Sequence, residues 1–586
     1  MKKLISIQIF SVFFILLTEA QTIENITINI GSVCLTDSIN KPHMLGVIAG
    51  PLPNANSSAP DLTSRFQDIG VTTIRNNDYS DDRLDMERMF FCGTYPVTPS
   101  TPNYPKWDCD PNDNQFYHFT ESDVQFQNWV NGGFLPFFRL GGEFNHPLRH
   151  HDYKGPRSGE ETNWIRAGIK VVRRYNSFGA GANTLKGYLN IWTEYPQKNF
   201  WDRDSVDFNN FWCNSFDSLK TNFPNLKIGG PGFNTSVSTI LGNNNTVKTW
   251  VNLFLRELKS RNLKPDWIGF HVFSNNIEDF YKTALNYRKL LRAEAPFNTT
   301  YAPVWGTGNA SFFNGTELIC DAWGFDNDLS LSASARDSLF NKQRGAAHHV
   351  GAFIALQQAD IERAYIYRGG EMVSDTTLSI MGLFQGNANG SYKPVAYGFK
   401  LCSKMQTIYN RKLISPVDTI ASGGSKIWTL AGEDSVGNKA ILISNPTANT
   451  INLSLTINGI SLSTSLYPYV NQYTVTDINN GQTPSPWTSG TFALPPYTSH
   501  LITMASSTVG INQLSTNTNN LTLYPNPTNS TINFSEVLEN IKVYNVVDQL
   551  VFSQIEPAKS ISVKDWKNGI YFIHSNNLIL KFIVEH

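Results

Sequence analysis

Glu194 is the residue whose surroundings most suggest catalysis. It lies in "NIWTEYPQKNFW", residues 190–201, directly after an apolar run and between Trp192 and Tyr195. A carboxyl group held among aromatic rings is partly desolvated, and desolvation favours the protonated form that a general acid needs. The alternative interpretation is a solvated acid in an ordinary loop.

Polar residues also follow other short apolar segments of the first 400 residues. Those that could bind a sugar near Glu194 are Arg75, Thr193, His271, Trp305, Thr307 and Asn309. Two further carboxylates, Glu143 and Glu371, follow the segments 135–140 and 364–368. Polar groups for hydroxyls and rings for apolar sugar faces are what a carbohydrate pocket requires, and we expect Trp192, Tyr195, Trp201, Phe270 and Trp305 to supply the rings.

The elements that must position these residues alternate between strands and helices. The apolar segments predict eight strands, at 44–48, 72–75, 135–140, 188–193, 226–230, 266–272, 301–306 and 364–368. Helical spacing predicts helices between them, at 61–69, 160–178, 206–221, 247–260, 279–291 and 336–356. Eight such units predict a closed (β/α)₈ barrel, an α/β fold whose chemistry lies at the carboxyl ends of the strands. The rival, an open doubly wound sheet, is disfavoured because no Gly-rich phosphate loop follows the first strand.

Six segments resemble glycoside hydrolase family 39, clan A barrels that include β-xylosidases and α-L-iduronidases. They occur in family order between about Gly46 and Phe399, roughly 350 residues. They are "GVTTIRNNDYSDD" at 70–82, "YHFTESDVQFQNWVNGGFLPFFRLG" at 117–141, "LNIWTEYPQKNFW" at 189–201, "PDWIGFHVF" at 265–273, "PVWGTGNASF" at 303–312 and "GLFQGNANGSYKPVAYGFKL" at 382–401. The resemblance implies that Glu194 is the general acid/base and that His271 orients the carboxylates or the substrate.

Two positions depart from the family pattern. Thr193 stands where the family has an Asn that binds the sugar 2-hydroxyl, and a hydroxyl can replace part of that bonding. Thr307 stands where the family has its nucleophilic Glu, two residues before Asn309. A threonine hydroxyl without an adjacent base is not ionised near neutral pH, so the usual glycosyl-enzyme ester cannot form.

Three explanations of the missing nucleophile stay open. Another carboxylate, Glu143 or Glu371, or Glu317 with less support, takes over as nucleophile or as base for a water. Alternatively, a substrate group or a water held by Thr307 assists, with Glu194 as the acid. In the third, the barrel no longer hydrolyses anything and is a catalytically inactive, secreted carbohydrate-binding protein.

Composition and the N-terminus point outside the cytoplasm. The net charge of −1 gives no reason to expect nucleic acid as a partner. Residues 1–20 resemble a signal peptide, with Lys2 and Lys3 before an apolar run, and no other stretch is long enough to span a membrane.

Of the six cysteines, Cys92 and Cys109 are the preferred disulfide because they would close a Pro/Asn-rich loop. The spacing of His146, His150 and His151 favours a loop over a metal site, and no cofactor is expected.

The chain after the barrel, which we place at residues 21–400, changes pattern. Residues 401–505 show alternating short strands and predict a β-sandwich, and 506–520 are a Ser/Thr/Asn-rich linker. Residues 521–586, with "LTLYPNPTNSTINF" and "NGIY", resemble the C-terminal sorting domain of the type IX secretion system. That resemblance implies secretion machinery as a partner and a secreted or cell-surface location.

The expected function is therefore that of a secreted glycosidase. The resemblance to family 39 implies exo-action on β-xylosides or related sugars of a plant or algal polysaccharide. Glu194 is the expected proton donor, and the identity of the second catalytic group is open.

Overall fold

The structure is a computed structural model, and it describes most of residues 23–586. The stretches that it does not describe are 33–39, 52–59, 77–83, 91, 93–106, 143–154, 179–186, 196, 198–199, 235–244, 327–330, 371–380, 386–389, 459, 462–469, 475–484, 487–490, 505–521, 546–548 and 576–577. The predicted signal peptide, the linker, Glu143, Glu371 and the three loop histidines His146, His150 and His151 lie outside the described residues. The described chain divides into two compact units, 1–507 and 508–586.

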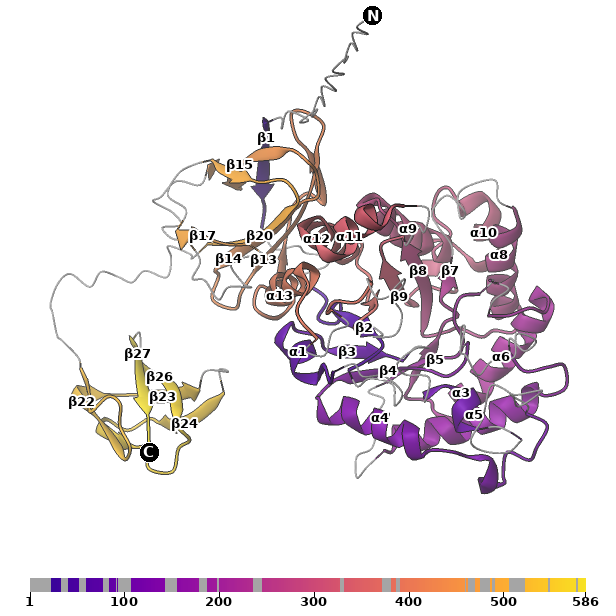
Figure 1. Cartoon of the computed structure of the whole chain (residues 1–586), viewed down its shortest axis with the longest axis horizontal. Helices are drawn as coiled ribbons and strands as arrows, with labels where there is room; N and C mark the ends of the chain where they lie inside the picture. Colours follow the sequence, from indigo (N-terminus) through magenta and orange to yellow (C-terminus); the bar gives the residue numbers. More distant parts are fainter. Residues whose placement is uncertain are drawn as a thin grey trace, which may run out of the picture. The chain divides into compact units, whose positions relative to one another are not determined.

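Within the described residues, eight parallel strands form a closed barrel (Figure 1). They are β2 (Gly46–Ile48), β3 (Thr73–Arg75), β4 (Leu135–Arg139), β5 (Tyr188–Asn190), β6 (Lys227–Gly229), β8 (Trp267–Phe273), β9 (Glu317–Gly324) and β10 (Arg363–Tyr367), with the two-residue β7 (Phe233–Asn234) also paired to β8. Gly229 of β6 pairs with Trp267 of β8 and closes the cylinder. The barrel fold is therefore confirmed.

Side chains fill the inside of the barrel. Phe137, Trp267 and Tyr365 meet there, with ring centroids 5.1 and 4.6 Å from Phe137. All three rings are fully buried. The cylinder is thus a packed core rather than a channel, and a ligand can reach it only at an end.

Helices cover the outside of the barrel. They are α1 (Thr63–Asp68), α3 (Met86–Met89), α4 (Thr120–Asn131), α5 (Glu161–Asn176), α6 (Ser205–Asn222), α8 (Asn245–Ser260), α9 (Ile277–Leu291), α10 (Asn298–Trp305), α11 (Ala333–Asn341), α12 (Gln343–Gln358) and α13 (Pro394–Thr407). On α5, Trp164, Gly168, Val171 and Tyr175 are buried at the three- and four-residue spacing that predicted this helix.

The seventh strand is not where the sequence pattern placed it. Residues 301–306 belong to α10 and its end, and the strand is β9, Glu317–Gly324. The prediction for strand seven is therefore wrong. Residues 301–305 contain Tyr, Val and Trp, which are common in strands, although they form part of a helix. Strand β9, by contrast, carries Asp321 in the middle of its apolar run.

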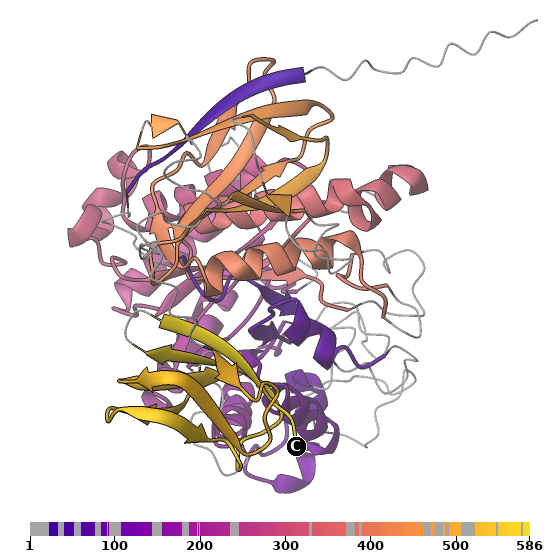
Figure 2. The same cartoon turned by 90° about the vertical axis from the view of Figure 1, so that its left-hand side faces the viewer.

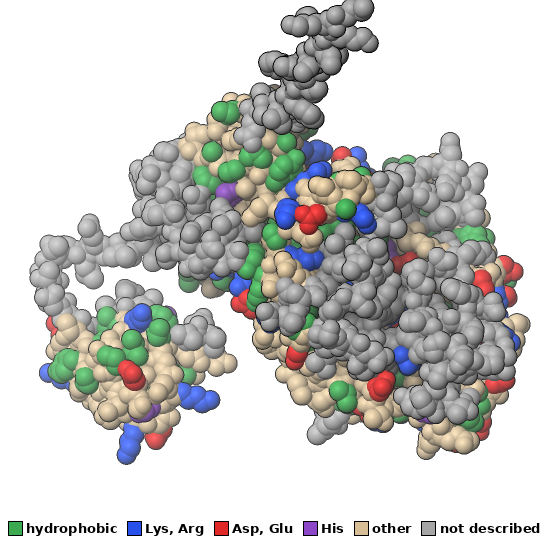
Figure 3. Space-filling view, in the orientation of Figure 1, with side chains coloured by type: hydrophobic (Ala, Val, Ile, Leu, Met, Phe, Trp, Pro, Cys, Tyr) green, Lys and Arg blue, Asp and Glu red, His purple; other side chains and the backbone are tan. Residues whose placement is uncertain are grey.

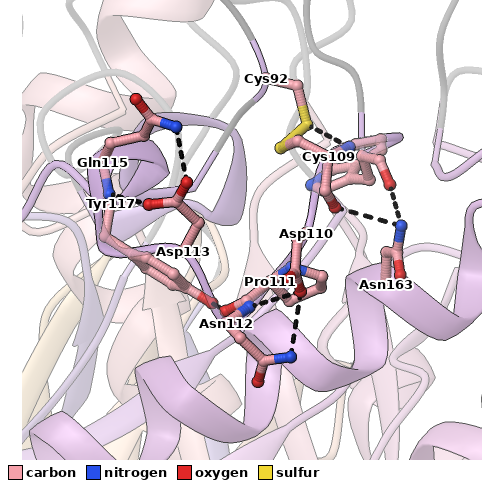
Figure 4. The surroundings of a disulfide bond; sticks show 10 residues. Cys92, Cys109, Asp110, Pro111, Asn112, Asp113, Gln115, Tyr117 and Asn163 are labelled. Carbon is pink, nitrogen blue, oxygen red and sulfur yellow. Dashed lines mark hydrogen bonds between the residues drawn. A yellow bond between two sulfur atoms is a disulfide. The ribbon is translucent and has the colours of Figure 1, made fainter.

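The predicted disulfide between Cys92 and Cys109 is present (Figure 4). The Asn163 side chain on α5 donates hydrogen bonds to the Trp107 and Cys109 carbonyls, at 2.9 and 3.2 Å. The Tyr117 hydroxyl donates to the Pro111 carbonyl at 2.7 Å. The disulfide thus ties a loop to the outer surface of the barrel. Cys213, Cys320 and Cys402 are buried free thiols.

The β-sandwich follows the barrel and packs against it. Its strands are β11 (Arg411–Leu413), β12 (Asp418–Ile420), β13 (Lys426–Glu433), β14 (Lys439–Asn445), β15 (Thr450–Ile457), β16 (Ile460–Ser461), β17 (Val470–Thr474), β18 (Ser485–Pro486), β19 (Phe492–Leu494) and β20 (Thr498–Met504). Helix α12 packs on β13, β14 and β20. The Ser444 hydroxyl donates to the Ala347 carbonyl of α12 at 2.6 Å, and the Gln358 amide donates to the Thr429 carbonyl at 3.0 Å.

The sandwich also takes a strand from the start of the described chain. Strand β1 (Ile23–Ile30) pairs in parallel with β15 and lies among the orange strands in Figure 2. Its buried residues alternate with exposed ones, as a half-buried strand requires. The barrel, which we expected to begin at residue 21, therefore starts only after this strand.

The second unit, 508–586, is a small β-sandwich by itself. Its two sheets are formed by β21 (Leu523–Tyr524), β22 (Thr531–Leu538) and β25 (Ala558–Ser562), and by β23 (Ile541–Asn545), β24 (Leu550–Gln554), β26 (Gly569–Ser575) and β27 (Leu578–Val584). Ile532, Val543, Ile573 and Phe582 are fully buried between the sheets.

Candidate active site

Glu194 lies in the turn that follows strand β5, at the carboxyl end of the barrel. Its backbone has a positive φ of 55°, and its N–H donates to the Gly232 carbonyl at 2.9 Å. A non-glycine residue in this conformation carries strain of about 1–3 kcal/mol, and such strain concentrates at functional sites. The side chain is 22% exposed, so the carboxylate reaches solvent.

His271 on β8 contacts this carboxylate from the strand two places along the barrel. Its Nδ1 lies 3.2 Å from Glu194 Oε1 and its Nε2 lies 3.4 Å from Asp321 Oδ2. The imidazole is buried, with 1% of its side chain exposed. Each ring nitrogen therefore faces a different carboxylate, and His271 links the two acids.

Asp321 is the second acid of the site, and it comes from the true seventh strand. It lies at a β-bulge, because Phe270 and His271 pair with Cys320 and Ala322 and leave Asp321 as the extra residue. A bulge re-aims a side chain. The carboxylate is fully buried and interacts through Oδ2 with His271, with the Asn190 amide at 3.1 Å and with the Arg75 guanidinium at 3.3 Å.

Arg75 and Thr193 complete this buried network. The Arg75 guanidinium donates to Thr193 Oγ1 at 2.7 Å, and the same hydroxyl lies 3.4 Å from His271 Nε2. Thr193 is thereby held next to Glu194. A buried carboxylate with a guanidinium, an imidazole and an amide around it is paired and hydrogen-bonded, as burial of a charge requires.

The pKa of His271 is raised above its ordinary value. Burial alone would lower the pKa by disfavouring the imidazolium, but the charges and hydrogen bonds of Asp321 and Glu194 outweigh burial. His271 therefore holds its proton to a higher pH than a free histidine does. A protonated His271 donates toward both carboxylates and fixes the orientation of Glu194.

Two glycines leave room for this network. A Cβ atom on Gly232 would lie 2.6 Å from Asp321 Oδ2 and 3.0 Å from His271 Nε2. A Cβ atom on Gly269 would lie 2.6 Å from Asp321 Oδ1. The buried acid therefore depends on the absence of side chains at both positions.

The second carboxylate oxygen of Glu194 faces an amide. The Asn234 side chain donates to Oε2 at 3.4 Å. Asn234 lies on β7, directly after Gly232 and Phe233. Both oxygens of Glu194 thus have a polar neighbour, while the group stays open to solvent on another side.

The aromatic residues around Glu194 do not form the expected sugar platform. Trp192, Tyr195, Trp201, Phe270 and Trp305 are each at most 2% exposed. Tyr195 stacks on Phe208 at 3.8 Å, inside the core. The expectation that these rings line a pocket is therefore wrong, because the backbone around Glu194 turns the neighbouring side chains inward while Glu194 faces the mouth.

The shift of strand seven also removes three predicted residues from the site. Trp305 ends α10 and is buried against Tyr301 at 4.6 Å. Thr307 precedes a short 3₁₀ turn, and the Asn309 side chain accepts from Arg292 at 3.3 Å on the surface. Glu317 lies at the opposite end of the barrel, where β9 begins, and pairs with Lys227. None of these four residues is near Glu194, so Thr307 does not occupy the nucleophile position.

Of the predicted site residues, the structure brings together Arg75, Thr193, Glu194 and His271. Sequence reasoning missed Asp321, Asn190 and Asn234. The signal for Asp321 was an acid inside the apolar run "ELICDAWG", since an acid is rarely buried without a partner. Among the described residues, no group of three or more His, Cys, Asp or Glu side chains could hold a metal ion, and no helix is long and apolar enough to cross a membrane.

Comparisons with known proteins match the two units separately. Residues 522–585 match the family described as the secretion system C-terminal sorting domain. This match confirms the sorting domain, and the protein is secreted or held at the cell surface. No protein of curated function matches the sequence.

Solved structures resemble the rest of the chain. A glucosidase from Croceicoccus marinus has a TM-score of 0.58 at 16% identity, over 83% of this chain and 99% of its own. An α-L-arabinofuranosidase from Thermotoga maritima, solved with arabinose, has a TM-score of 0.50 at 12% identity, over 82% and 100%. A family 39 glycoside hydrolase from Bacteroides cellulosilyticus WH2 has a TM-score of 0.48 at 13% identity, over 80% and 82%. At these identities the likeness to the glucosidase and the arabinofuranosidase establishes a shared fold and no more.

Proposed function

We propose that the barrel is a secreted glycoside hydrolase in which Glu194 is the general acid. The observation that carries the proposal is the strained backbone of Glu194 at the barrel mouth, with its carboxylate 3.2 Å from a buried histidine. A strained residue persists only where its surroundings enforce it, and here they aim a carboxylate toward solvent at the end where barrel enzymes react.

His271 is the positioning residue for that acid. Its imidazole has Asp321 on one side and Glu194 on the other, so the ring links Asp321 to Glu194. When Glu194 gives its proton to the departing sugar oxygen, the resulting carboxylate gains the hydrogen bond of a charged imidazole.

The second catalytic group stays a proposal with two candidates, Glu143 and Glu371. In the sequence Glu143 comes after β4 and Glu371 after β10, and both lie outside the described residues. Asp321 is less suited to attack a sugar, because it is fully buried and engaged by Arg75, Asn190 and His271. A retaining enzyme needs about 5 Å between the two carboxyl groups and an inverting one about 6.5–9.5 Å.

The substrate class follows from the family 39 resemblance, which suggests β-xylosides or related chain-end sugars of plant or algal polysaccharide. The fold resemblance to a glucosidase and an arabinofuranosidase supports a glycosidic substrate in general. The sorting domain supports export by the type IX system, whose machinery is the proposed partner.

Hydrolysis of aryl glycosides and oligosaccharides by wild type and Glu194→Gln tests the proposal. We expect the variant to lose about 10²–10⁴-fold in kcat and to keep sugar binding, because general acid catalysis supplies a factor of that size. Glu257→Gln on the outer helix α8 is the control and should retain full activity. Equal activity of Glu194→Gln and wild type would refute the role of Glu194.

A carbohydrate-binding protein without hydrolysis is the second candidate. The full burial of Asp321 favours this second candidate. Asp321 is the carboxylate that the described part of strand seven brings into the Glu194 network, and a sugar cannot reach it. Sugar binding by wild type, with no turnover of any substrate in the panel, would establish this alternative.

A further inference from the structure

A second hollow lies where the barrel meets the sandwich, apart from the Glu194 network. It has a volume of about 170 Å³. The barrel contributes Asn275, Phe325 and two residues of α12, and the sandwich contributes β13 and the turn after β14. Barrel and sandwich belong to one compact unit, so the hollow is part of that unit's structure.

Two aromatic side chains give the hollow apolar walls. Phe325 follows β9 and is 1% exposed, and Trp428 lies on β13 and is 2% exposed. These buried rings close one side of the hollow, so polar groups must supply most of its recognition of a ligand.

His348 is a buried polar group facing this hollow. It is 5% exposed and stacks on Phe325 with ring centroids 3.8 Å apart. Neither ring nitrogen makes a hydrogen bond of ordinary geometry with a described residue. The Ser274 backbone raises the pKa of His348 only weakly. Burial, with smaller effects of His349 and Arg344, lowers the pKa of His348 well below its usual value. The neutral ring therefore offers one donor and one acceptor, the pair that a sugar hydroxyl can satisfy.

Arg344 gives the rim of the hollow an available positive charge. It lies one helical turn before His348 on α12 and forms no ion pair with any described residue. Its guanidinium lies 5.6 Å from the centre of the Tyr497 ring. The other cation at the rim, Lys426, is engaged by Asp418 at 2.8 Å and by Glu278 at 3.5 Å. A free guanidinium fork matches a carboxylate or a sulfate group.

The hollow is on the same side of the barrel as Glu194. Phe325 directly follows the carboxyl end of β9, and Asn275 comes four residues after His271, which contacts Glu194. Four residues of extended chain span at most about 14 Å. One polysaccharide chain of a few sugar units can therefore reach both sites.

We propose that this hollow binds an anionic pyranose unit, carrying a carboxylate or a sulfate group, of the polysaccharide that the barrel acts on. Arg344 pairs with the anion and His348 bonds a hydroxyl, while the buried Phe325 and Trp428 border the hollow. The link to a polysaccharide substrate rests on the proposed hydrolase function, whereas binding of the anionic sugar itself does not.

Calorimetric binding to the full chain carrying Glu194→Gln tests the proposal without turnover. The probes are an oligogalacturonate, a sulfated galacto-oligosaccharide and a neutral xylo-oligosaccharide of equal length. We expect at least one acidic probe to bind more tightly than the neutral one, and Arg344→Gln to weaken that probe about 10-fold, as loss of a charge-assisted pair does. Comparison of the two acidic probes identifies the anion.

Two further variants separate binding from folding. Arg166→Gln removes an exposed arginine on α5 and should leave affinity unchanged. His348→Phe keeps the stacked ring but removes both nitrogens, and should weaken the acidic probe at a melting temperature unchanged at about pH 7.5. Equal affinity of all three probes, no binding of either acidic probe, or full affinity in Arg344→Gln would each overturn the proposal. Hydrolysis by wild type is scored separately, so absence of turnover overturns the proposed function and not this site.

Discussion

His271 Nδ1 lies 3.2 Å from Glu194 Oε1, and the opposite nitrogen of the same ring lies 3.4 Å from Asp321 Oδ2. The three residues come from strands β8 and β9 and from the turn after β5. A buried negative charge therefore reaches the exposed acid through one imidazole. The protonation of His271 therefore depends on both carboxylates.

Asp321→Asn tests this coupling. The variant keeps the side-chain shape but removes the charge that raises the pKa of His271, so the pKa of His271 should fall. His271 then loses its proton at lower pH, and the alkaline limb of kcat/KM should move to lower pH. We also expect about 3 kcal/mol less stability, because Arg75 loses its buried counter-charge.

NMR titration of the His271 ring and a pH–rate profile check this expectation. A merely structural role of Asp321 would reduce activity by the same factor at every pH. An unchanged titration of His271 in Asp321→Asn would contradict the coupling.

Gly232→Ala should damage the same network from another direction. The added Cβ would meet Asp321 Oδ2 at 2.6 Å and His271 Nε2 at 3.0 Å, and the positive φ of 64° adds strain. We expect a loss of about 2–4 kcal/mol in stability together with loss of activity. Thermal denaturation and kcat measure the two effects.

Gly187→Ala is a matched control for that experiment. Gly187 also has a positive φ, 96°, but a Cβ atom there would meet no atom of the described residues within 4 Å. The control therefore carries the backbone strain without the clash, and it should lose about 1–2 kcal/mol while keeping its activity. If both variants lose activity equally, backbone strain and not the crowding of Asp321 is the cause.

Seven of the eight barrel strands and most helices follow from the sequence pattern, and the exception is informative. Strand seven carries Asp321, which interrupts its apolar run and makes the run look unlike a buried strand. The acid is tolerated only because Arg75, Asn190 and His271, all distant in sequence, surround it. Local pattern cannot show such partners, so the strand was assigned to the aromatic segment of α10 instead.

The residues of the candidate site could be predicted where the pattern placed their strands correctly. Glu194, His271, Arg75 and Thr193 follow strands that the pattern identifies, and the structure brings them together. Trp305, Thr307 and Asn309 depended on the misplaced strand and moved with it. Similarly, β1 joins the sandwich because its partner β15 lies more than 400 residues away, a pairing that no local signal encodes.

Surface charge agrees with the composition. In Figure 3, acidic and basic side chains are mixed over the described surface on that face of the barrel, without a large field of either sign. This agrees with a net charge of −1. Arg344 is exposed at the rim of the hollow, so we expect added salt to weaken binding of the acidic probes there.

Removal of the disulfide should destabilise the barrel unit. Cys92 and Cys109 close a loop with a sequence separation of 17, and a disulfide of that span stabilises the fold by about 3 kcal/mol because it lowers the entropy of the unfolded chain. We expect Cys92→Ser with Cys109→Ser to lower the free energy of unfolding of the barrel unit by about that amount. Chemical denaturation measures it, and addition of reductant to wild type should reproduce the loss, since Cys213, Cys320 and Cys402 are free thiols. A reductant effect that persists in the double variant would show that another bond is responsible.

Acid should destabilise the barrel unit through its buried neutral histidines. Burial lowers the pKa of His43 and His349 to about 4, and that of His348 well below its usual value. In the unfolded chain these groups bind protons near pH 6.5, so between about pH 6.5 and 4 the unfolded state holds more protons and stability falls as the pH falls. His271 affects stability in the opposite direction. Its raised pKa stabilises the fold at low pH, and this contribution is lost as the pH rises through that pKa.

Melting temperatures at about pH 5 and 7.5 should therefore differ, with the lower melting temperature at pH 5. The difference should shrink in His348→Phe because one proton-binding group is gone. A larger difference in that variant than in wild type would show that His348 is charged in the folded protein.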